Sequence, residues 1–262
     1  MIASIRGSVT NLLKYRFLLN ELVVREIKIK YKRSVLGILW SVLNPLMMMI
    51  IMNVVFSGLF RMDIPNFLVY YLTASLLFGF MQEATSGALY SIFGNAGLIN
   101  KVYIPKYIFP LAKTESSLVN FLFSLVALAI VAALTGVHAS LALLAAPLLF
   151  AVFFVFVLGL SLIFSTYAVF FRDLIHFHGI LMLMWMYVTP IFYPEKLLAD
   201  RVPWLLNANP IYYYVRCFRL VVLQGTVPDS SLSLQCIGIS LLSLCAGLLV
   251  FKRNQARFAL FF

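Results

Sequence analysis

The chain has 262 residues, of which 63% are hydrophobic and only 11% are charged, and its mean hydropathy is +1.00. A soluble domain of this length needs more polar surface than 20 basic and 9 acidic residues can cover, so the composition excludes one. The net charge of +11 would suggest a nucleic-acid partner for a soluble protein. In a membrane protein the positions of the basic residues matter more than their number, so we expect no nucleic-acid partner.

Residues 1–35 precede the first long apolar stretch. They carry charges every few residues and lack the apolar core of a cleaved signal peptide, so we expect them to remain in the cytoplasm. Within them, residues 18–33 contain good helix formers and neither proline nor glycine. At 100° per residue, Val23, Ile27 and Tyr31 share one face. The pattern predicts an N-terminal amphipathic helix on the cytoplasmic leaflet.

The basic face of this helix has two interpretations. It carries Arg25, Lys28 and Lys32, which can meet anionic lipid head groups and so set the orientation of the chain. Alternatively, these cations, together with Ser34 and the turn that follows it, receive a phosphate-bearing substrate. Charge alone does not separate the two interpretations.

Six apolar stretches are long enough to cross a bilayer, which takes about 20 residues. They lie at residues 34–60, 64–82 (where the helix can run on toward Leu89), 107–134, 141–170, 174–192 and 232–251. The first contains Asn44 and Pro45, where we expect a kink because proline lacks the backbone donor. The sequence therefore predicts one all-α integral membrane domain over 1–262, with six transmembrane helices within 36–251 and a cytoplasmic tail at 252–262.

An even number of spans places both chain ends on the same side of the membrane. If both ends are cytoplasmic, fifteen of the 20 basic residues lie on the inner side. This asymmetry is the positive-inside pattern of membrane proteins. We therefore expect a multi-pass membrane protein with both termini inside the cell.

Two connections are more than simple loops between consecutive transmembrane helices. Residues 91–110 are apolar but broken by glycine and proline, and predict a short amphipathic element on the inner surface. Residues 202–225 are interrupted at Asn209 and Pro210 and carry Arg216 and Arg219. They are too broken to span, and predict a pair of re-entrant or interfacial helices on the outer side.

Catalytic chemistry has no support in the sequence. It contains no P-loop, nucleophile elbow, zinc-protease or dinucleotide-binding motif. The three cysteines and three histidines show no metal-ligand spacing. We expect no catalytic residue, no metal and no cofactor bound by this chain, and hence not an enzyme.

The chain holds forty aromatic residues, more than two interfacial belts require. Most are expected in lipid-facing belts or in the core. A subset can line a passage, where flat rings slide along sugars without tight binding. The candidates on the first and fifth stretches are Trp40, Phe56, Phe60, Trp185, Tyr187, Phe192 and Tyr193.

Five segments occur in an order that is typical of one family. They are REIKIKYKRSVLGILWSVLNPL (25–46), NKVYIPKYIFPL (100–111), VFFRDL (169–174), TPIFYP (189–194) and NPIYYYV (209–215). Together they resemble the permease subunit of type 2 ABC exporters of cell-surface polysaccharides, which export O-antigen of lipopolysaccharide, capsule or teichoic acid. The resemblance covers about residues 19–251.

This resemblance implies a location in the bacterial cytoplasmic (inner) membrane, a function and partners. Two copies would form a channel, and each would dock a separate ATP-binding cassette subunit that binds ATP and Mg. The substrate would be a polysaccharide linked to polyprenyl pyrophosphate. By the resemblance, the pyrophosphate would meet Arg25, Lys28, Lys32, Arg33, Ser34, Leu36 and Gly37. Contacts that couple to the ATPase would involve Glu21, Glu26, Asn95, Asn100, Lys101 and Lys106.

Other functions remain open at this point. One is a type 2 ABC permease for a small hydrophobic drug or lipid. Another is an integral membrane transferase acting on lipid-linked sugars, although the nine acidic residues show no paired carboxylate by spacing. A proton-coupled transporter is disfavoured because no carboxylate falls near the middle of a span.

Overall fold

The computed structural model describes residues 14–61, 64–99, 101–102 and 104–260. Within this part of the chain every regular element is helical and no strand occurs, which confirms the predicted all-α class. The longer helices are α2 (Arg16–Tyr31), α3 (Trp40–Asn53), α4 (Phe67–Ser91), α6 (Ile108–Leu134), α7 (Ala146–Phe170), α8 (Leu174–Val188), α11 (Pro210–Arg219) and α12 (Ser230–Asn254). The shorter elements are η1 (Gly37–Leu39), η2 (Val54–Leu59), η3 (Phe93–Asn95), α5 (Ala96–Ile99), η4 (Leu141–Ala145), α9 (Glu195–Arg201), α10 (Pro203–Ala208), η5 (Leu220–Gln224) and η6 (Gln255–Leu260).

Five helical stretches among the described residues are long and apolar enough to cross a membrane. They are Gly37–Leu59, Phe67–Ser91, Ile108–Leu134, Leu141–Phe170 and Ser230–Phe258. They correspond to the first four predicted spans and the last one, although the second continues past residue 82 to Ser91. The protein is therefore a multi-pass membrane protein.

The predicted fifth span at 174–192 is shorter in the structure. α8 has 15 residues and ends at Val188. Thr189 precedes Pro190 and has extended backbone angles (φ −90°, ψ 130°), as the ring of a following proline favours. By length α8 falls below the about 20 residues of a typical spanning helix, so the predicted count of six is not confirmed.

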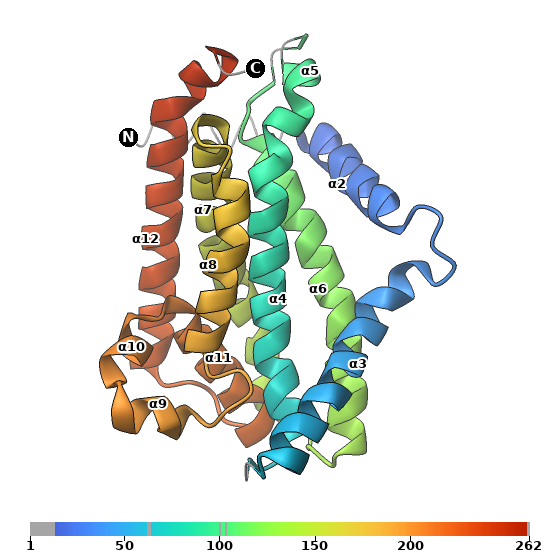
Figure 1. The fold of residues 1–262 in the computed structure, drawn as a ribbon, viewed down its shortest axis with the longest axis vertical. Helices are drawn as coiled ribbons and strands as arrows, with labels where there is room; N and C mark the ends of the chain where they lie inside the picture. The colour runs from blue at the N-terminus through green and yellow to red at the C-terminus, as the bar shows by residue number, and fades with distance from the viewer. Residues whose placement is uncertain (1–13, 62–63, 100, 103, 261–262) are drawn as a thin grey trace.

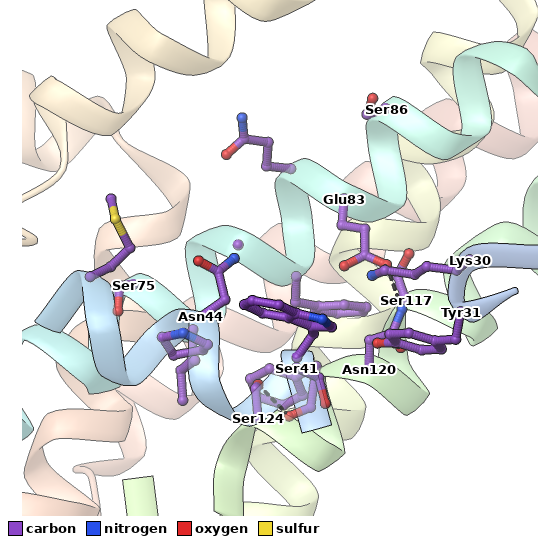
Figure 2. Close-up of a pocket in the computed structure, with 18 of the residues that line it drawn as sticks. Lys30, Tyr31, Ser41, Asn44, Ser75, Glu83, Ser86, Ser117, Asn120 and Ser124 are labelled. Atoms are coloured by element: carbon purple, nitrogen blue, oxygen red, sulfur yellow. Dashed lines mark hydrogen bonds and ion pairs between the residues drawn. The ribbon is translucent and has the colours of Figure 1, made fainter. Parts of the chain in front are cut away.

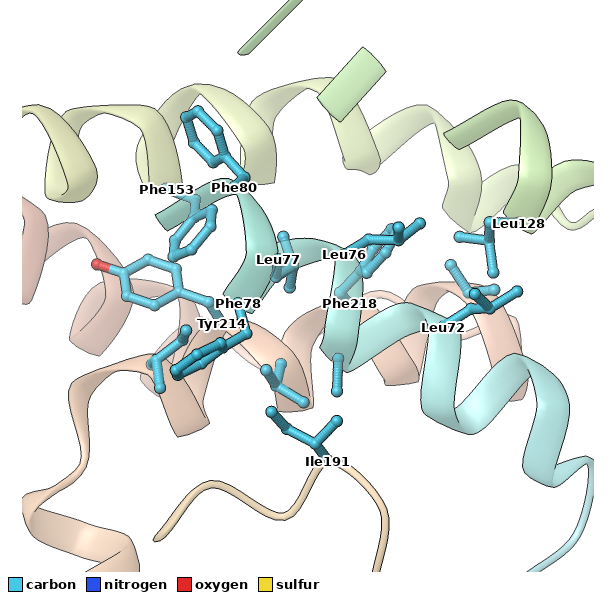
Figure 3. Close-up of a cluster of buried hydrophobic side chains, with 14 of the residues drawn as sticks. Leu72, Leu76, Leu77, Phe78, Phe80, Leu128, Phe153, Ile191, Tyr214 and Phe218 are labelled. Carbon is cyan, nitrogen blue, oxygen red and sulfur yellow. The ribbon is translucent and has the colours of Figure 1, made fainter. Parts of the chain in front are cut away.

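α4 is the central helix of the bundle (Figure 1). In an 18-residue apolar segment of α4, 67% of the residues are buried, whereas the corresponding share in the span that contains α3 is 6%. Figure 3 shows Leu72 and Leu77 of α4 in one cluster with Phe153 of α7 and Phe218 of α11. The core therefore forms around α4, while α3 lies at the edge.

α7 and α12 form the tightest helix pair. A Cβ on Gly159 of α7 would lie 2.4 Å from the backbone of Ser243, and one on Gly247 would lie 2.5 Å from the Gly159 carbonyl oxygen. Ser240 and Ser243 of α12 donate hydrogen bonds to backbone carbonyls of α7, at 2.8 and 2.9 Å. Small residues allow this close approach, as is common between membrane helices.

The short connections gather at the two ends of the bundle (Figure 1). The start of α2, η3, α5 and the C-terminal turns of α12 lie at one end, where Leu22, Ile92, Phe251 and Phe258 share a buried cluster. At the other end lie α9, α10 and α11. α10 and α11 lie within residues 202–225, where the sequence predicts a pair of re-entrant or interfacial helices. Segments that the sequence predicts on the same side of the membrane therefore lie at the same end of the bundle.

Candidate functional site

A cavity of about 760 Å³ lies between α2, α3, α4 and α6 (Figure 2). The side of α4 that faces it carries polar side chains beside apolar ones. Ser75, Gln82 and Ser86 recur with Gly79 every three or four residues and so share one helix face, and Leu76 and Phe80 also line the cavity. The opposite side of α4 is buried in the core, so α4 separates a packed interior from a polar hollow.

The walls formed by α6 and α3 also carry polar side chains. α6 contributes Ser117, Asn120 and Ser124, and α3 contributes Ser41 and Asn44, again at helical spacing. Polar residues on one face of a predicted span are the signal that marks such a wall. Our sequence predictions missed these residues because they rested on charges and aromatic rings.

Four side chains close the cavity beside the last turn of α2. Lys30 Nζ donates to Glu83 Oε1 at 2.9 Å, and Asn120 Nδ2 donates to the same oxygen at 2.6 Å. Tyr31 Oη donates to Asn120 Oδ1 at 3.0 Å. This network joins α2 to α4 and α6 and leaves the charges of Lys30 and Glu83 paired (Figure 2).

The face of α2 predicted to be apolar turns toward the bundle, where Tyr31 bonds to α6 and Val23 packs against a buried cluster. However, Phe17, Val24 and Ile29 are exposed, so apolar side chains are not confined to one side. The helix is therefore less cleanly amphipathic than predicted, and begins at Arg16 rather than residue 18.

A shallow groove of about 480 Å³ runs along the exposed side of α2. It is lined by Arg25, Lys28 and Lys32, the predicted substrate cations, together with Glu21. Helical spacing brings the three cations together, as predicted. Among the residues that the structure describes, Lys28 and Lys32 form no ion pair.

The predicted turn after α2 is present. Arg33 and Gly37 have positive φ angles of 66° and 50°. The Gly37 backbone N–H donates to Ser34 Oγ at 3.0 Å, and Leu36 is exposed. The Ser34 side chain thereby stabilises the reversal between α2 and α3.

Arg25 has a second role that its charge did not indicate. Its Nη2 donates at 3.0 Å both to Glu26 Oε1 and to Asn95 Oδ1, which lies in η3. Lys113 Nζ of α6 donates to the other oxygen of Glu26 at 2.5 Å. Asn95, Arg25, Glu26 and Lys113 therefore form a chain from the short η3–α5 connection to α6.

This arrangement favours the ionised form of Glu26. Burial raises the pKa of its carboxyl, but the hydrogen bonds from Lys113 and Arg25, with their positive charges, lower it more. The net pKa lies below its ordinary value of 4.5. The carboxylate thus stays charged over the whole neutral range and can hold both cations.

The remaining predicted coupling residues are dispersed. Glu21 and Lys101 are exposed. Lys106 Nζ donates to the Gln255 carbonyl at 2.7 Å, and burial lowers the pKa of this ammonium. Asn100 lies outside the described residues.

Five of the predicted channel aromatics form one group at the end of the bundle opposite α2. Phe56 stacks on Phe192 with ring centroids 4.9 Å apart and contacts Phe60 at 5.7 Å. Phe192 also meets Tyr187 and Tyr193 edge-on, at 5.7 and 5.5 Å. These rings join the end of the first span to the loop after α8.

The two tryptophans lie elsewhere. Trp40 lines the cavity and is 44% exposed. Trp185 is partly buried, and its Nε1 donates to Asn209 Oδ1 at 2.8 Å. The structure thus does not unite the seven predicted aromatic residues in one wall.

Arg219 occupies a position that the sequence did not predict. It is only 7% exposed, and its Nη2 donates to the Pro190 carbonyl at 2.7 Å and to the Tyr70 carbonyl at 3.2 Å. The guanidinium lies 3.4 Å from the Tyr70 ring centroid. Arg219 thereby ties α11 to α4 and to the loop after α8.

Comparison with known proteins identifies the class. The family described as ABC-2 type transporter matches residues 18–223. This match covers most of the chain, including the cavity and the α2 groove. The chain belongs to the ABC-2 type transporter family, and is a membrane subunit of a transporter.

Relatives extend the likeness over nearly the whole chain. An O-antigen export system permease protein RfbA of Klebsiella pneumoniae is 30% identical over 236 residues, which are 90% of this chain and 91% of the relative. A second protein of that name from the same species is 29% identical over 236 residues. The RfbA of Myxococcus xanthus is 28% identical over 253 residues, which are 96% and 97% of the two chains.

Proposed function

We propose that the chain is the membrane-spanning subunit of an ATP-driven exporter that moves a polyprenyl-pyrophosphate-linked polysaccharide across the bacterial cytoplasmic membrane. The observation that carries this proposal is the end-to-end similarity to relatives named O-antigen export permeases. The cargo is an O-antigen, a capsular polysaccharide or a teichoic acid. The chain supplies the passage and no catalytic group.

The proposed assembly contains two copies of this chain. In each copy α8 serves as the short fifth of six spans, with both termini in the cytoplasm. Ile50, Ile51 and Val54 of the first span are each more than half exposed. Such an apolar surface needs lipid or another protein to cover it, which supports pairing through this span.

The energy comes from two ATP-binding cassette subunits, which bind the ATP and Mg. They dock at residues 91–106, which include the η3–α5 connection, and on residues 21–33, which include most of α2. The contact of Arg25 with Asn95 supports this proposal because it joins the two elements that would receive the motion. The Glu26–Lys113 pair then extends the path to α6.

The pyrophosphate binds on the exposed side of α2. Lys28 and Lys32 are suited to it because they line one groove and their charges are not taken up by carboxylates in the described part of the chain. Arg25 is engaged by Glu26 and Asn95, so its main contribution is to hold α2 in place. Phosphate groups favour such clustered cations.

Replacement of both lysines tests this role. We expect Lys28→Glu/Lys32→Glu to abolish surface polysaccharide while the chain still inserts, because two repulsive charges replace two attractive ones. Surface polymer is measured by immunoblot, and insertion by the amount of permease in the membrane fraction. Arg201→Glu, on exposed α9 at the other end, is the matched control and should export normally. Normal export by the double variant would remove the head-group role.

Transport of a small hydrophobic drug or lipid is the second candidate. The serine and amide side chains that α3, α4 and α6 place in the cavity do not favour it, because an apolar cargo would leave them without partners. A gene deletion that impairs drug efflux and leaves surface polymer intact would support this candidate over polysaccharide export.

A further inference from the structure

We propose that the cavity between α2, α3, α4 and α6 binds uncharged sugar units of the transported polymer. This site is distinct from the α2 groove proposed for the pyrophosphate, and it rests on the proposed function. Its volume of about 760 Å³ lies within the roughly 300–1,000 Å³ of ordinary ligand sites.

The lining has the two features that sugars require. Trp40, which is 44% exposed, offers an aromatic face for the C–H surface of a pyranose ring. Serine hydroxyls and the amides of Asn44 and Gln82 offer donors and acceptors for its hydroxyl groups. A lipid chain or an apolar drug would leave these polar groups without partners.

Several of these groups have unused hydrogen-bonding capacity. In the part of the chain that the structure describes, the side chains of Asn44, Gln82, Ser86 and Ser117 have no hydrogen-bond partner. Pro45 has no N–H to donate to the Ser41 carbonyl, which leaves a further acceptor on α3. Unpaired polar groups at membrane depth are costly, so they need a polar occupant.

The charges of the lining restrict the class of ligand further. Lys30 and Glu83 are the charged residues of the lining, and they are paired with each other at 2.9 Å. Lys28 and Lys32, which form no ion pair within the described part of the chain, lie in the α2 groove instead. A pyrophosphate is therefore attracted to the groove, and neutral sugars suit the cavity.

Loss of the amides tests the site. Asn44→Leu/Gln82→Leu should reduce surface polymer about ten-fold, as expected for the loss of a net hydrogen bond or two. The matched control is Gln235→Leu, the same change at an exposed position of α12 outside the cavity. All variants are compared at equal amounts of permease in the membrane. Unchanged export by the double variant, or an equal loss in the control, would overturn the proposal.

A labelling experiment does not depend on substitution of the amides. Ser86→Cys is introduced in a chain whose Cys217, Cys236 and Cys245 are replaced by alanine, and is treated with a hydrophilic maleimide in inside-out membrane vesicles. We expect labelling to be several-fold slower in membranes from cells that make the polymer than in membranes from cells blocked in its synthesis. Equal labelling would overturn the proposal, as would absence of labelling in both, which indicates that a second copy fills the cavity.

The outcomes separate this site from the proposed function. If Lys28→Glu/Lys32→Glu stops export and the amide variant does not, the exporter assignment stands and the sugar site falls. If deletion of the whole gene leaves surface polymer unchanged, the exporter assignment itself falls.

Discussion

Two sides of this molecule differ in how their helices meet. On the side of α7, α11 and α12, glycines allow backbone contact, serine hydroxyls bond across helices and a buried arginine links three segments. On the side of α2 and α3, the first span is almost unburied and polar groups surround a hollow. Apolar helices thus pack closely on one side of the molecule and border a cavity on the other.

The difference follows from the physics of the bilayer. Lipid tails cover an apolar helix surface as well as leucine side chains of another helix do. Membrane helices therefore associate through small residues and polar contacts. The seam of α7 and α12 has both. α3 contacts α4 and α6, but little of its surface is buried, and we propose that its exposed surface meets cargo and a second copy.

The strongest test of the seam is Gly159→Leu. Its side chain would overlap Ser243, since even a Cβ lies 2.4 Å from that backbone. We expect a loss of about 3 kcal/mol or more, at the upper end of overpacking effects, and little folded protein. Size-exclusion chromatography of detergent extracts measures the folded fraction. Gly238→Leu on α12, where nothing lies within 4 Å, should fold normally.

A smaller loss is expected at the buried arginine. Arg219→Gln removes the charged donor to the Pro190 and Tyr70 carbonyls and should lower stability by about 2 kcal/mol. Thermal unfolding of the purified protein reports the change. Arg216→Gln, an exposed position on the same helix, serves for comparison. Equal unfolding temperatures for the two variants would show that the Arg219 contacts add nothing.

On the open side, Glu26→Gln should loosen α2 by only about 0.5 kcal/mol, because the ion pairs are partly exposed. The pKa of Glu26 is lowered in the folded protein, so its contribution is present at neutral pH and is lost as pH falls through that lowered pKa, below 4.5. Hydrogen exchange of α2 amides should therefore differ between wild type and variant at pH 7 and converge in acid. Glu21→Gln is the control, and a difference that persists in acid would contradict the pairing.

The smallest effect on folding is expected at the cavity. Gly79→Leu projects from α4 into open space, with nothing within 4 Å of an added Cβ, so stability should change by less than about 0.5 kcal/mol. Export should nevertheless fall because the side chain occupies the hollow. Unfolding temperature and surface polymer are measured on the same variant. A stable Gly79→Leu protein that exports normally would show that cargo bypasses this space.

The sequence predicted the parts of the fold that local patterns determine. Five spans were placed with most of their ends within three residues, because long apolar runs end at charges and turns. The α2 cations were grouped because helical spacing alone brings them together. The end of α8 was missed, although Pro190 was the local signal for it. The bond from Arg25 to Asn95 and the burial of Arg219 against Tyr70 join residues far apart in the chain, and no local pattern reveals such pairs.

The most direct test of the account is transport in proteoliposomes that contain this chain and its ATP-binding subunit, loaded with a polyprenyl-pyrophosphate-linked polysaccharide. The account predicts that the polymer crosses the bilayer only when ATP is hydrolysed, and that Lys28→Glu/Lys32→Glu permease abolishes the movement. Transfer by the permease alone without ATP, or ATP hydrolysis by the complex with no transfer of polymer, would contradict it.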